Sequence, residues 1–540
     1  MSPFRMSRSA RRPRAALIAA VVLAAALAAA PRGARAQPGA VLPPAGDPLA
    51  GFDAYAEQAR RDWGVPGMSV GIVRNDSVVL LRGYGVRTLG RPEPVGVRTL
   101  FANASTTKAF TALAAAQLVD AGRLAWDDRA ADRVPGFALA DPWATREVTV
   151  RDLLRHQLGF GDPGYLWYLA DDSLPALLQR LARVPAQTSL RAHFAYNNLG
   201  YGVAGLAVAR AAGRPSWDDV VRERILVPLG MADTRTRGSL VPDAADVASA
   251  HDVVRDTLRA LPPWMRGAVE AVPAAGSMYS SAADMTRWLR FLLDPARRGP
   301  AAAALVSDSS FGELLAPQAL VGADEFYPTA RRTRPAFTAY GLGWFLQDYR
   351  GEKVAYHTGS IDGTVAMVGL LPARRTGIVV FANRDHAELR HALMLRAFDA
   401  ALGATAGPAA GAPPRDWSAE LRALYDSAAV RRRQAAARAD SARARDPRPM
   451  RAAADYAGAY ADPLYGRATV RAEGGRLVLA LSRRAVADLE PLGGDAFRAR
   501  WRETPWNPPA PVQFTPGADG RVRTLLVGGD GGAAFARADR

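Results

Sequence analysis

A serine and a lysine in the segment Ser-Thr-Thr-Lys are the residues best suited to covalent chemistry. Ser105 and Lys108 stand three positions apart at the start of an expected helix, and residues with this spacing lie on one helix face. A serine hydroxyl becomes a good nucleophile when a neighbouring base takes its proton, and a lysine amine serves as that base when burial lowers its pKa. The motif alone is common, but the chain has only one other lysine, Lys353. The pair is therefore a candidate nucleophile and base.

Two further segments hold polar side chains at the ends of expected elements. Tyr196 and Asn198 precede an apolar helix, and His357, Gly359 and Ser360 end an expected strand in His-Thr-Gly-Ser. A glycine on a strand lets another backbone approach closely. Taken singly, each segment is better explained as an ordinary loop or turn.

A second serine lies in a segment that matches a catalytic motif only by coincidence. Ser69 lies in Gly-Met-Ser-Val-Gly, which matches the G-x-S-x-G pattern of a nucleophile elbow. That elbow requires a strand, a sharp turn and then a helix. Here the sequence continues Val-Gly-Ile-Val as a strand, so we interpret Ser69 as part of a sheet.

The pattern of elements predicts an α/β domain. Residues 67–81 indicate two strands joined at Asn75-Asp76, and residues 105–121 indicate a helix that stops at Gly122. Strands are also expected at residues 341–346, 353–356, 364–371 and 377–383. Strands at both ends with helices between them predict one sheet built from both termini of the domain.

The N-terminus has the order of a secretory signal. Residues 1–36 hold seven arginines and no acid, and an apolar run at 15–30 precedes Ala-Arg-Ala. We expect a signal peptide, cleavage after Ala36 and a periplasmic or secreted protein. The run is short and alanine-rich for a membrane span, so cleavage is favoured over an uncleaved anchor. No other segment approaches a membrane span, so none is expected after cleavage.

Composition excludes several classes of function. The chain has no cysteine, which rules out disulfides, thiol catalysis and cysteine-bound metal. His386 and His391 lack the spacing of H-E-x-x-H, so we expect no metal and no cofactor. The net charge is +17, but seven of those charges lie in the signal peptide. The three consecutive arginines at 431–433 lie in a polar helix with interspersed acidic residues, so no nucleic acid partner is expected.

The last part of the chain predicts a separate small domain. A Pro/Gly/Ala linker at 404–414 leads to a polar helix from about 416 to 445, and short strand-like runs follow from Tyr456. The predicted organisation is a signal peptide at 1–36, an α/β domain with the candidate nucleophile at 37–403, a linker and helix at 404–452, and an all-β domain at 453–540.

Together and in this order, the three motifs resemble the serine β-lactamase/penicillin-binding-protein superfamily, specifically its class C β-lactamase-like branch. Flanking phrases such as Gly-Leu-Gly-Trp and Phe-Ala-Asn extend the resemblance over about residues 50–400. The stretch Tyr-Ala-Gly-Ala-Tyr after residue 455 resembles a lipocalin-like barrel appended to some members. The resemblance implies an α/β fold, a β-lactamase/transpeptidase-like domain of antiparallel sheet plus helical region, followed by a small β-barrel.

The resemblance also implies roles for the proton-handling residues. Ser105 would be the acylated nucleophile, and Lys108 and Tyr196 would share the work of base and acid. Because their titrations are coupled, the base is left open between them. Asn198 would bind Lys108 or the amide of the substrate.

Further roles concern substrate binding. The backbone N–H groups of Ser105 and Ser360 would form the oxyanion hole, and Gly359 would permit their approach. His357 stands where drug-hydrolysing members have a lysine, and histidine is mostly uncharged near pH 7. We therefore rank esters and short peptides or amides above β-lactams.

The predicted function is that of an exported serine hydrolase which cleaves ester or amide bonds of small molecules or short peptides through an acyl-enzyme. One alternative is a β-lactamase or D,D-carboxypeptidase that acts on β-lactams or cell-wall peptides. Another is a catalytically weak binding or sensor protein on the same fold. The natural substrate, the role of the last domain and the oligomeric state stay open.

Overall fold

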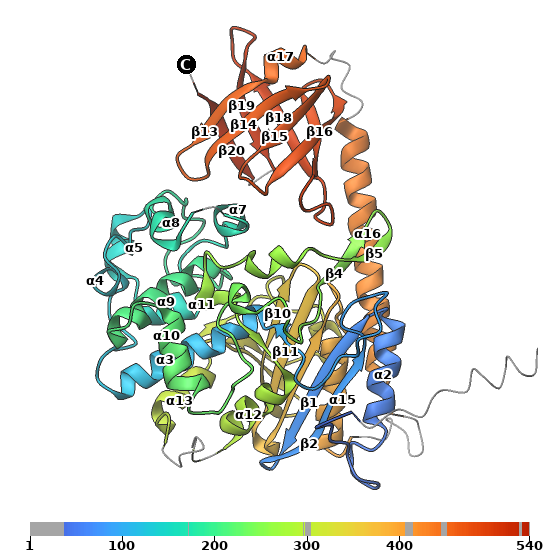
Figure 1. Cartoon of the computed structure of the whole chain (residues 1–540). Coiled ribbons are helices and arrows are strands. Elements are labelled where there is room, and N and C mark those ends of the chain that lie inside the picture. The colour runs from blue at the N-terminus through green and yellow to red at the C-terminus, as the bar shows by residue number, and fades with distance from the viewer. Residues whose placement is uncertain are drawn as a thin grey trace, which may run out of the picture.

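The structure is a computed structural model that describes residues 37–170, 172–294, 296, 304–404, 414–443, 451–528 and 532–538. The predicted signal peptide and most of the predicted linker lie outside the described residues. Figure 1 shows a lower α/β domain and an upper barrel, joined by one long helix.

An eight-stranded antiparallel sheet forms the centre of the α/β domain. Its strands, in spatial order, are β2 (Ser77–Gly85), β1 (Gly67–Arg74), β12 (Thr376–Ala382), β11 (Thr364–Leu371), β10 (Glu352–Ile361), β9 (Phe345–Tyr349), β8 (Thr338–Tyr340) and β7 (Ala319–Leu320). Strand β1 pairs with β12 in the register Met68↔Ala382. The two ends of the domain therefore meet inside one sheet, as the sequence predicts.

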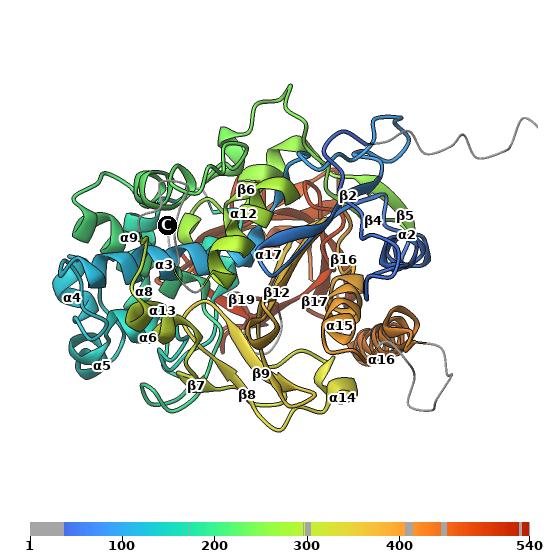
Figure 2. The ribbon, with the colours of Figure 1, turned by 90° about the horizontal axis from the view of Figure 1, so that it is seen from below.

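Helices cover both faces of this sheet. One face packs against α2 (Phe52–Asp62) and α15 (Leu389–Ala401), and the other against α12 (Ala282–Leu293). Figure 2 shows α15 and α12 on opposite sides of the strands. Because both faces are covered, every residue of β11 and β12 is buried, and these strands are continuous apolar runs without alternation.

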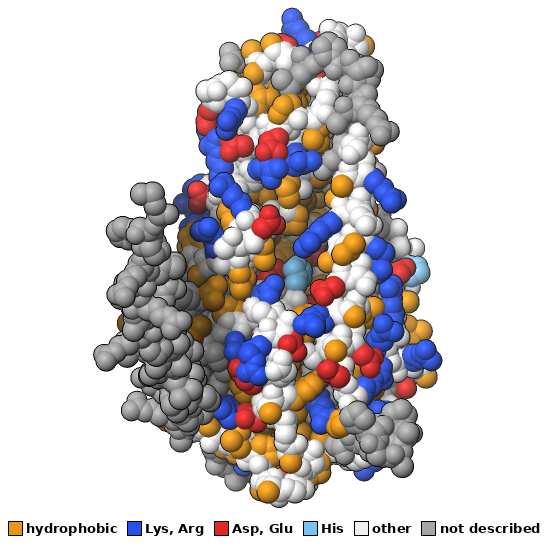
Figure 3. Space-filling model, turned by 90° about the vertical axis from the view of Figure 1, so that its right-hand side faces the viewer, with side chains coloured by type: hydrophobic (Ala, Val, Ile, Leu, Met, Phe, Trp, Pro, Cys, Tyr) orange, Lys and Arg blue, Asp and Glu red, His pale blue; other side chains and the backbone are white. Residues whose placement is uncertain are grey.

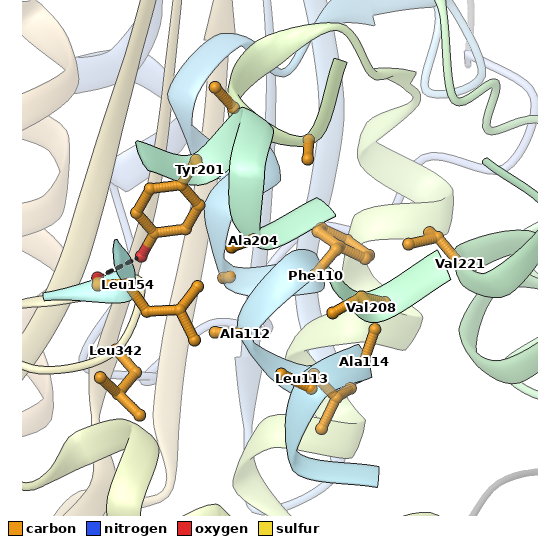
Figure 4. Close-up of a cluster of buried hydrophobic side chains, with 14 of the residues drawn as sticks. Phe110, Ala112, Leu113, Ala114, Leu154, Tyr201, Ala204, Val208, Val221 and Leu342 are labelled. Carbon is orange, nitrogen blue, oxygen red and sulfur yellow. Dashed lines mark hydrogen bonds between the residues drawn. The ribbon is translucent and has the colours of Figure 1, made fainter. Parts of the chain in front are cut away.

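The helical region is centred on α3 (Lys108–Asp120), in which eleven of thirteen residues are buried. Its alanines let α9 (Asn198–Ala212) pack closely against it, and Figure 4 shows side chains of the two helices in contact. The hydroxyl of Tyr201 on α9 donates a hydrogen bond to the carbonyl of Leu154 at 2.7 Å. This packing fixes the first turns of α3 and α9, where Lys108 and Asn198 lie.

Shorter elements complete the α/β domain. They are β3 (Phe101–Ala102), η1 (Ala104–Thr107), α4 (Ala130–Arg133), α5 (Pro142–Glu147), α6 (Val150–Leu154), α7 (Gly164–Trp167), α8 (Leu174–Leu181), α10 (Trp217–Val221), η2 (Arg222–Leu226), η3 (Gly238–Leu240), β4 (His251–Val254), β5 (Thr257–Ala260), η4 (Pro263–Gly267), α11 (Pro273–Gly276), β6 (Tyr279–Ser280), α13 (Asp308–Leu315), α14 (Ala330–Thr333) and η5 (Pro372–Arg374).

Helix α16 (Trp417–Arg443) connects the two domains. It is anchored where it begins, because the indole N–H of Trp417 donates to the Asp399 carboxylate at 2.8 Å. On the face shown in Figure 3, side chains of Lys and Arg are interspersed with those of Asp and Glu. None of the described helices has both the length and the apolar character needed to cross a bilayer.

The second domain is a closed barrel of eight antiparallel strands. They are β13 (Gly458–Asp462), β14 (Gly466–Glu473), β15 (Arg476–Ala480), β16 (Val486–Gly493), β17 (Ala496–Trp501), β18 (Ala510–Pro516), β19 (Val522–Val527) and β20 (Ala533–Arg537). The short helix α17 (Ala453–Tyr456) covers the end that faces away from the α/β domain. The predicted fold class, an α/β domain followed by a small all-β barrel, is confirmed.

Two elements begin at residues other than those predicted from the sequence. The helix expected at 105–121 starts as the 3-10 turn η1 and becomes an α-helix only at Lys108. The strand expected at 341–346 begins at Phe345, because Gly343 turns with a φ of +85°. A Cβ at Gly343 would lie 3.0 Å from the Cα of Ala109, so the turn is set by its close approach to α3.

Candidate active site

The candidate nucleophile lies in a strained turn. Ser105 belongs to η1, and Ala104 before it has a φ of +47°, a left-handed conformation that costs about 1–2 kcal/mol for a residue with a Cβ. Such strain is characteristic of functional sites, where the surrounding structure holds it. In a 3-10 turn, side chains three residues apart are eclipsed. This geometry brings the Nζ of Lys108 to 3.1 Å from the Oγ of Ser105.

The amine of Lys108 is held by two carbonyl-type acceptors. It donates to the Oδ1 of Asn198 at 2.7 Å and to the backbone carbonyl of Ala275, in α11, at 2.8 Å. Lys108 is fully buried, and burial lowers its pKa to about 7. A neutral amine has two hydrogens and one lone pair. Since the two acceptors take the hydrogens, the lone pair faces the hydroxyl of Ser105 and can accept its proton.

Asp162 fixes the orientation of the Asn198 amide. The Nδ2 of Asn198 donates to the Oδ2 of Asp162 at 2.7 Å, so the amide oxygen must face Lys108. The other carboxylate oxygen accepts from the indole of Trp167 at 2.9 Å and from the backbone N–H of Asn198 at 3.2 Å. Sequence reasoning missed Asp162, because it lies in a loop that no motif marks.

Tyr196 lies beside this pair and keeps its proton at neutral pH. Its ring centroid is 4.8 Å from the Nζ of Lys108. Burial raises the pKa of Tyr196 well above 10, and a hydrogen bond with Ser105 opposes that rise only in part. The ring packs on His156 at a centroid distance of 4.3 Å, and His156 accepts the backbone N–H of Asn197 at 3.0 Å. Of the two groups that the sequence left open as base, Lys108 has the suitable pKa.

Strand β10 packs closely against the turn that carries Ser105. A Cβ at Gly359 would lie 2.2 Å from the carbonyl oxygen of Asn103 and 3.1 Å from the backbone nitrogen of Ser105. Only glycine permits this approach. Ser360, the next residue, is exposed. The backbone of β10 is thus adjacent to that of Ser105, where the resemblance implies an oxyanion hole.

We expect Gly359→Ala to lower kcat by about 10²-fold, the loss typical of one oxyanion-hole donor. The new methyl group must push β10 away from the Ser105 turn. Gly312→Ala is the matched control, since a Cβ at Gly312 on α13 meets no atom within 4 Å. Steady-state kinetics with an ester substrate check this. A Gly359→Ala enzyme as active as the control would contradict the required approach.

A buried ion pair between Arg390 and Glu388 is hydrogen-bonded to β10. Arg390 on α15 donates to the carbonyl oxygen of Gly359 at 2.5 Å and to the Oγ of Ser360 at 3.0 Å. Its guanidinium also forms two 3.0 Å hydrogen bonds with Glu388. Burial alone would raise the pKa of Glu388, but Arg390 outweighs it and the pKa is lowered. These two positioning residues were also missed, because the sequence alone does not bring residues 388–390 to residue 359.

His357 lies beneath the site and is uncharged. Its Nδ1 is 2.6 Å from the carbonyl oxygen of Thr358, and its Nε2 is 3.0 Å from the hydroxyl of Tyr340. Since a carbonyl only accepts, Nδ1 carries the proton and Nε2 accepts from Tyr340. Burial, together with the nearby Lys108, lowers the pKa of His357 to about 3. The ring therefore adds no positive charge, and its contact with a substrate stays a prediction.

The sequence pattern of the beta-lactamase family matches residues 52–402, more than half of the chain. The chain therefore belongs to the beta-lactamase family, as the motifs suggested. Residues 442–531 match a domain of unknown function, DUF3471. This second match includes the barrel strands from β13 through β19.

Similar proteins include penicillin-binding protein 4 of Amycolatopsis lactamdurans, 30% identical over 377 residues that cover 68% of this chain and 92% of that protein. An unguisins hydrolase of Aspergillus violaceofuscus is 28% identical over 364 residues, or 63% of this chain. The chain spans 62% of the length of that fungal relative.

Solved structures share the fold. An octameric penicillin-binding protein homologue from Pyrococcus abyssi superposes with a TM-score of 0.58 and 21% identity over 90% of this chain and 99% of its own. A class C beta-lactamase superposes with a TM-score of 0.53 and 18% identity over 67% of this chain and 97% of its own.

Proposed function

We propose that this protein is an exported serine hydrolase that acts through an acyl-enzyme at Ser105 on ester or amide bonds of small molecules or short peptides. The observation that carries the proposal is the amine of Lys108, which is buried, 3.1 Å from the Ser105 hydroxyl and held by two acceptors. Export rests on the predicted signal peptide at residues 1–36.

The first half of the reaction forms the acyl-enzyme. The Oγ of Ser105 attacks the carbonyl carbon while Lys108 takes the hydroxyl proton. The oxygen of the tetrahedral intermediate is stabilised by the backbone N–H groups of Ser105 and Ser360. As the bond to the leaving group breaks, Tyr196 donates a proton to the departing oxygen or nitrogen, and the proton on Lys108 restores the tyrosine.

The second half releases the acid. A water molecule gives its proton to the same base and attacks the acyl carbon, and the bond to the Oγ of Ser105 breaks. Ser105 then recovers its proton from Lys108, so the enzyme returns to its starting state. Both halves use one base whose pKa lies near neutral pH, about 7.

The substrate class follows from the charges at the site. Neutral His357 offers no cation for a substrate carboxylate. We therefore rank neutral esters and amides above anionic β-lactams. A β-lactamase or D,D-carboxypeptidase is the second candidate, favoured by the 30% identity to a penicillin-binding protein.

A substrate panel tests this ranking. We expect p-nitrophenyl esters to be turned over faster than amino-acid amides, and a chromogenic cephalosporin to be the slowest substrate. Turnover of the cephalosporin well above that of the esters would reverse the ranking. Covalent labelling of Ser105 without turnover of any ester, amide or lactam would instead indicate a binding or sensor protein.

A further inference from the structure

The barrel has one filled end and one open end. At the α17 end, the ring of Tyr456 packs 5.1 Å from that of Phe497 and 4.8 Å from that of Phe514. The hydroxyl of Tyr456 donates to the Asp495 carboxylate at 2.9 Å. The core of this half is therefore occupied by aromatic side chains. In an up-and-down barrel the connections alternate between ends, so those after β13, β15, β17 and β19 lie at the opposite end.

A cavity of about 790 Å³ lies at that opposite end. Described residues of all four connections contribute to its wall, among them Tyr465, Leu481, Thr504 and Gly528, and the core residues Ala533 and Phe535 also line it. The α/β domain contributes a wall that follows the loop carrying Asp162 and consists of Tyr165, Leu166, Tyr168, Leu169 and Ala170, with Asp172 and Arg180. Two domains thus border an open cavity of the size that small ligands occupy.

The barrel is fixed against this wall by contacts on both sides of the cavity. Leu464 is buried in the core of the α/β domain. The indole N–H of Trp506 donates to Asp362 at 2.7 Å, and the guanidinium of Arg484 stacks on Trp264 at 3.9 Å from the ring centroid. These contacts hold the two domains together beside the cavity.

Apolar side chains make up most of the lining of the cavity, beside tyrosine, serine, threonine and asparagine side chains, and charge is confined to a few residues. Its apolar lining residues include Leu166 and Leu169 of the α/β domain and Leu481, Trp501 and Phe535 of the barrel. Its charged lining residues are Asp172, Arg180 and Arg467. Arg180 and Asp172 neutralise each other in an ion pair of 2.9 Å. Among the described residues, no carboxylate forms an ion pair with the exposed Arg467, so the cavity has a mostly apolar wall and one available cation.

We propose that this interdomain cavity binds a fatty acid of eight or more carbons, with the hydrocarbon chain among the apolar side chains and the carboxylate at Arg467. The combination of a mostly apolar wall and a single available cation fits an amphipathic anion. It fits a polyanion poorly, because a polyanion needs several cations. The site is separate from Ser105 and does not depend on the proposed hydrolysis.

Calorimetric titration of the full chain carrying Ser105→Ala tests the proposal, with octanoate, decanoate and dodecanoate as probes. Because each buried methylene adds to the transfer free energy, the Kd should fall about fourfold per added methylene. Arg467→Ala should weaken decanoate at least fivefold and leave decan-1-ol unchanged. Absence of binding, or a Kd independent of chain length, would overturn the proposal.

Two substitutions in the wall complete the test. Leu481→Glu should weaken dodecanoate at least tenfold, since it places a like charge in the cavity, and Ala485→Phe should do the same by filling space. Leu320→Glu is the matched control, because Leu320 is 78% exposed and lies on β7, outside the cavity lining. Melting temperatures show which variants are folded. Unchanged dodecanoate binding in either folded wall variant would exclude this cavity as the site.

Discussion

Lys108→Arg is expected to lower kcat/KM by about 10³-fold, within the range that general acid–base catalysis contributes. Arginine keeps the positive charge but does not lose its proton in proteins. The variant therefore has no lone pair to accept the Ser105 proton, although a cation still occupies the site. The loss should appear in kcat as well as in kcat/KM, because the proton transfer belongs to the chemical step.

The chain supplies its own control for this substitution. Lys353, the only other lysine, lies on β10 and donates to the carbonyl of Leu315 at 2.5 Å. Lys353→Arg should keep wild-type turnover, and the melting temperature of both variants should be measured to exclude unfolding. Full turnover in a folded Lys108→Arg enzyme would contradict the role of Lys108 as base.

Ser105→Ala is expected to reduce ester hydrolysis by about 10⁵-fold, since the nucleophile acts as a unit with its base. Its matched control is Ser69→Ala, in the motif that imitates a nucleophile elbow. Ser69 is fully buried on β1, and its Oγ is 3.5 Å from the carbonyl of Arg82. Steady-state rates should therefore stay near wild type in Ser69→Ala. Loss of activity in the folded Ser69 variant with retention in the Ser105 variant would reverse our assignment.

Local patterns in the sequence predicted much of the fold. The turn at Asn75-Asp76 is a hairpin connection in which both residues have a positive φ, +48° and +68°, as asparagine and aspartate tolerate. Helix α16 and the strands of the all-β domain also follow from composition and alternation. Ser105 and Lys108 are brought together by spacing alone, because a single turn separates them.

The parts that could not be predicted depend on contacts between distant residues. Asp162 acts through Asn198, and Arg390 acts through Gly359. Neither pair leaves a periodic signal in the sequence. The start of β9 was misplaced for the same reason, since the turn at Gly343 is imposed by its contact with α3. Closure of the barrel likewise requires β13 to pair with β20.

The most direct test of the central claim is the pH dependence of covalent labelling by a fluorophosphonate, with the labelled residue located by peptide mass spectrometry. Burial lowers the pKa of Lys108 to about 7, so its amine is protonated and inactive as a base below that pH. We predict a label on Ser105 whose rate rises about tenfold per pH unit up to pH 7 and is constant above it. A rate independent of pH between 5 and 9, or a label on another residue, would contradict the account.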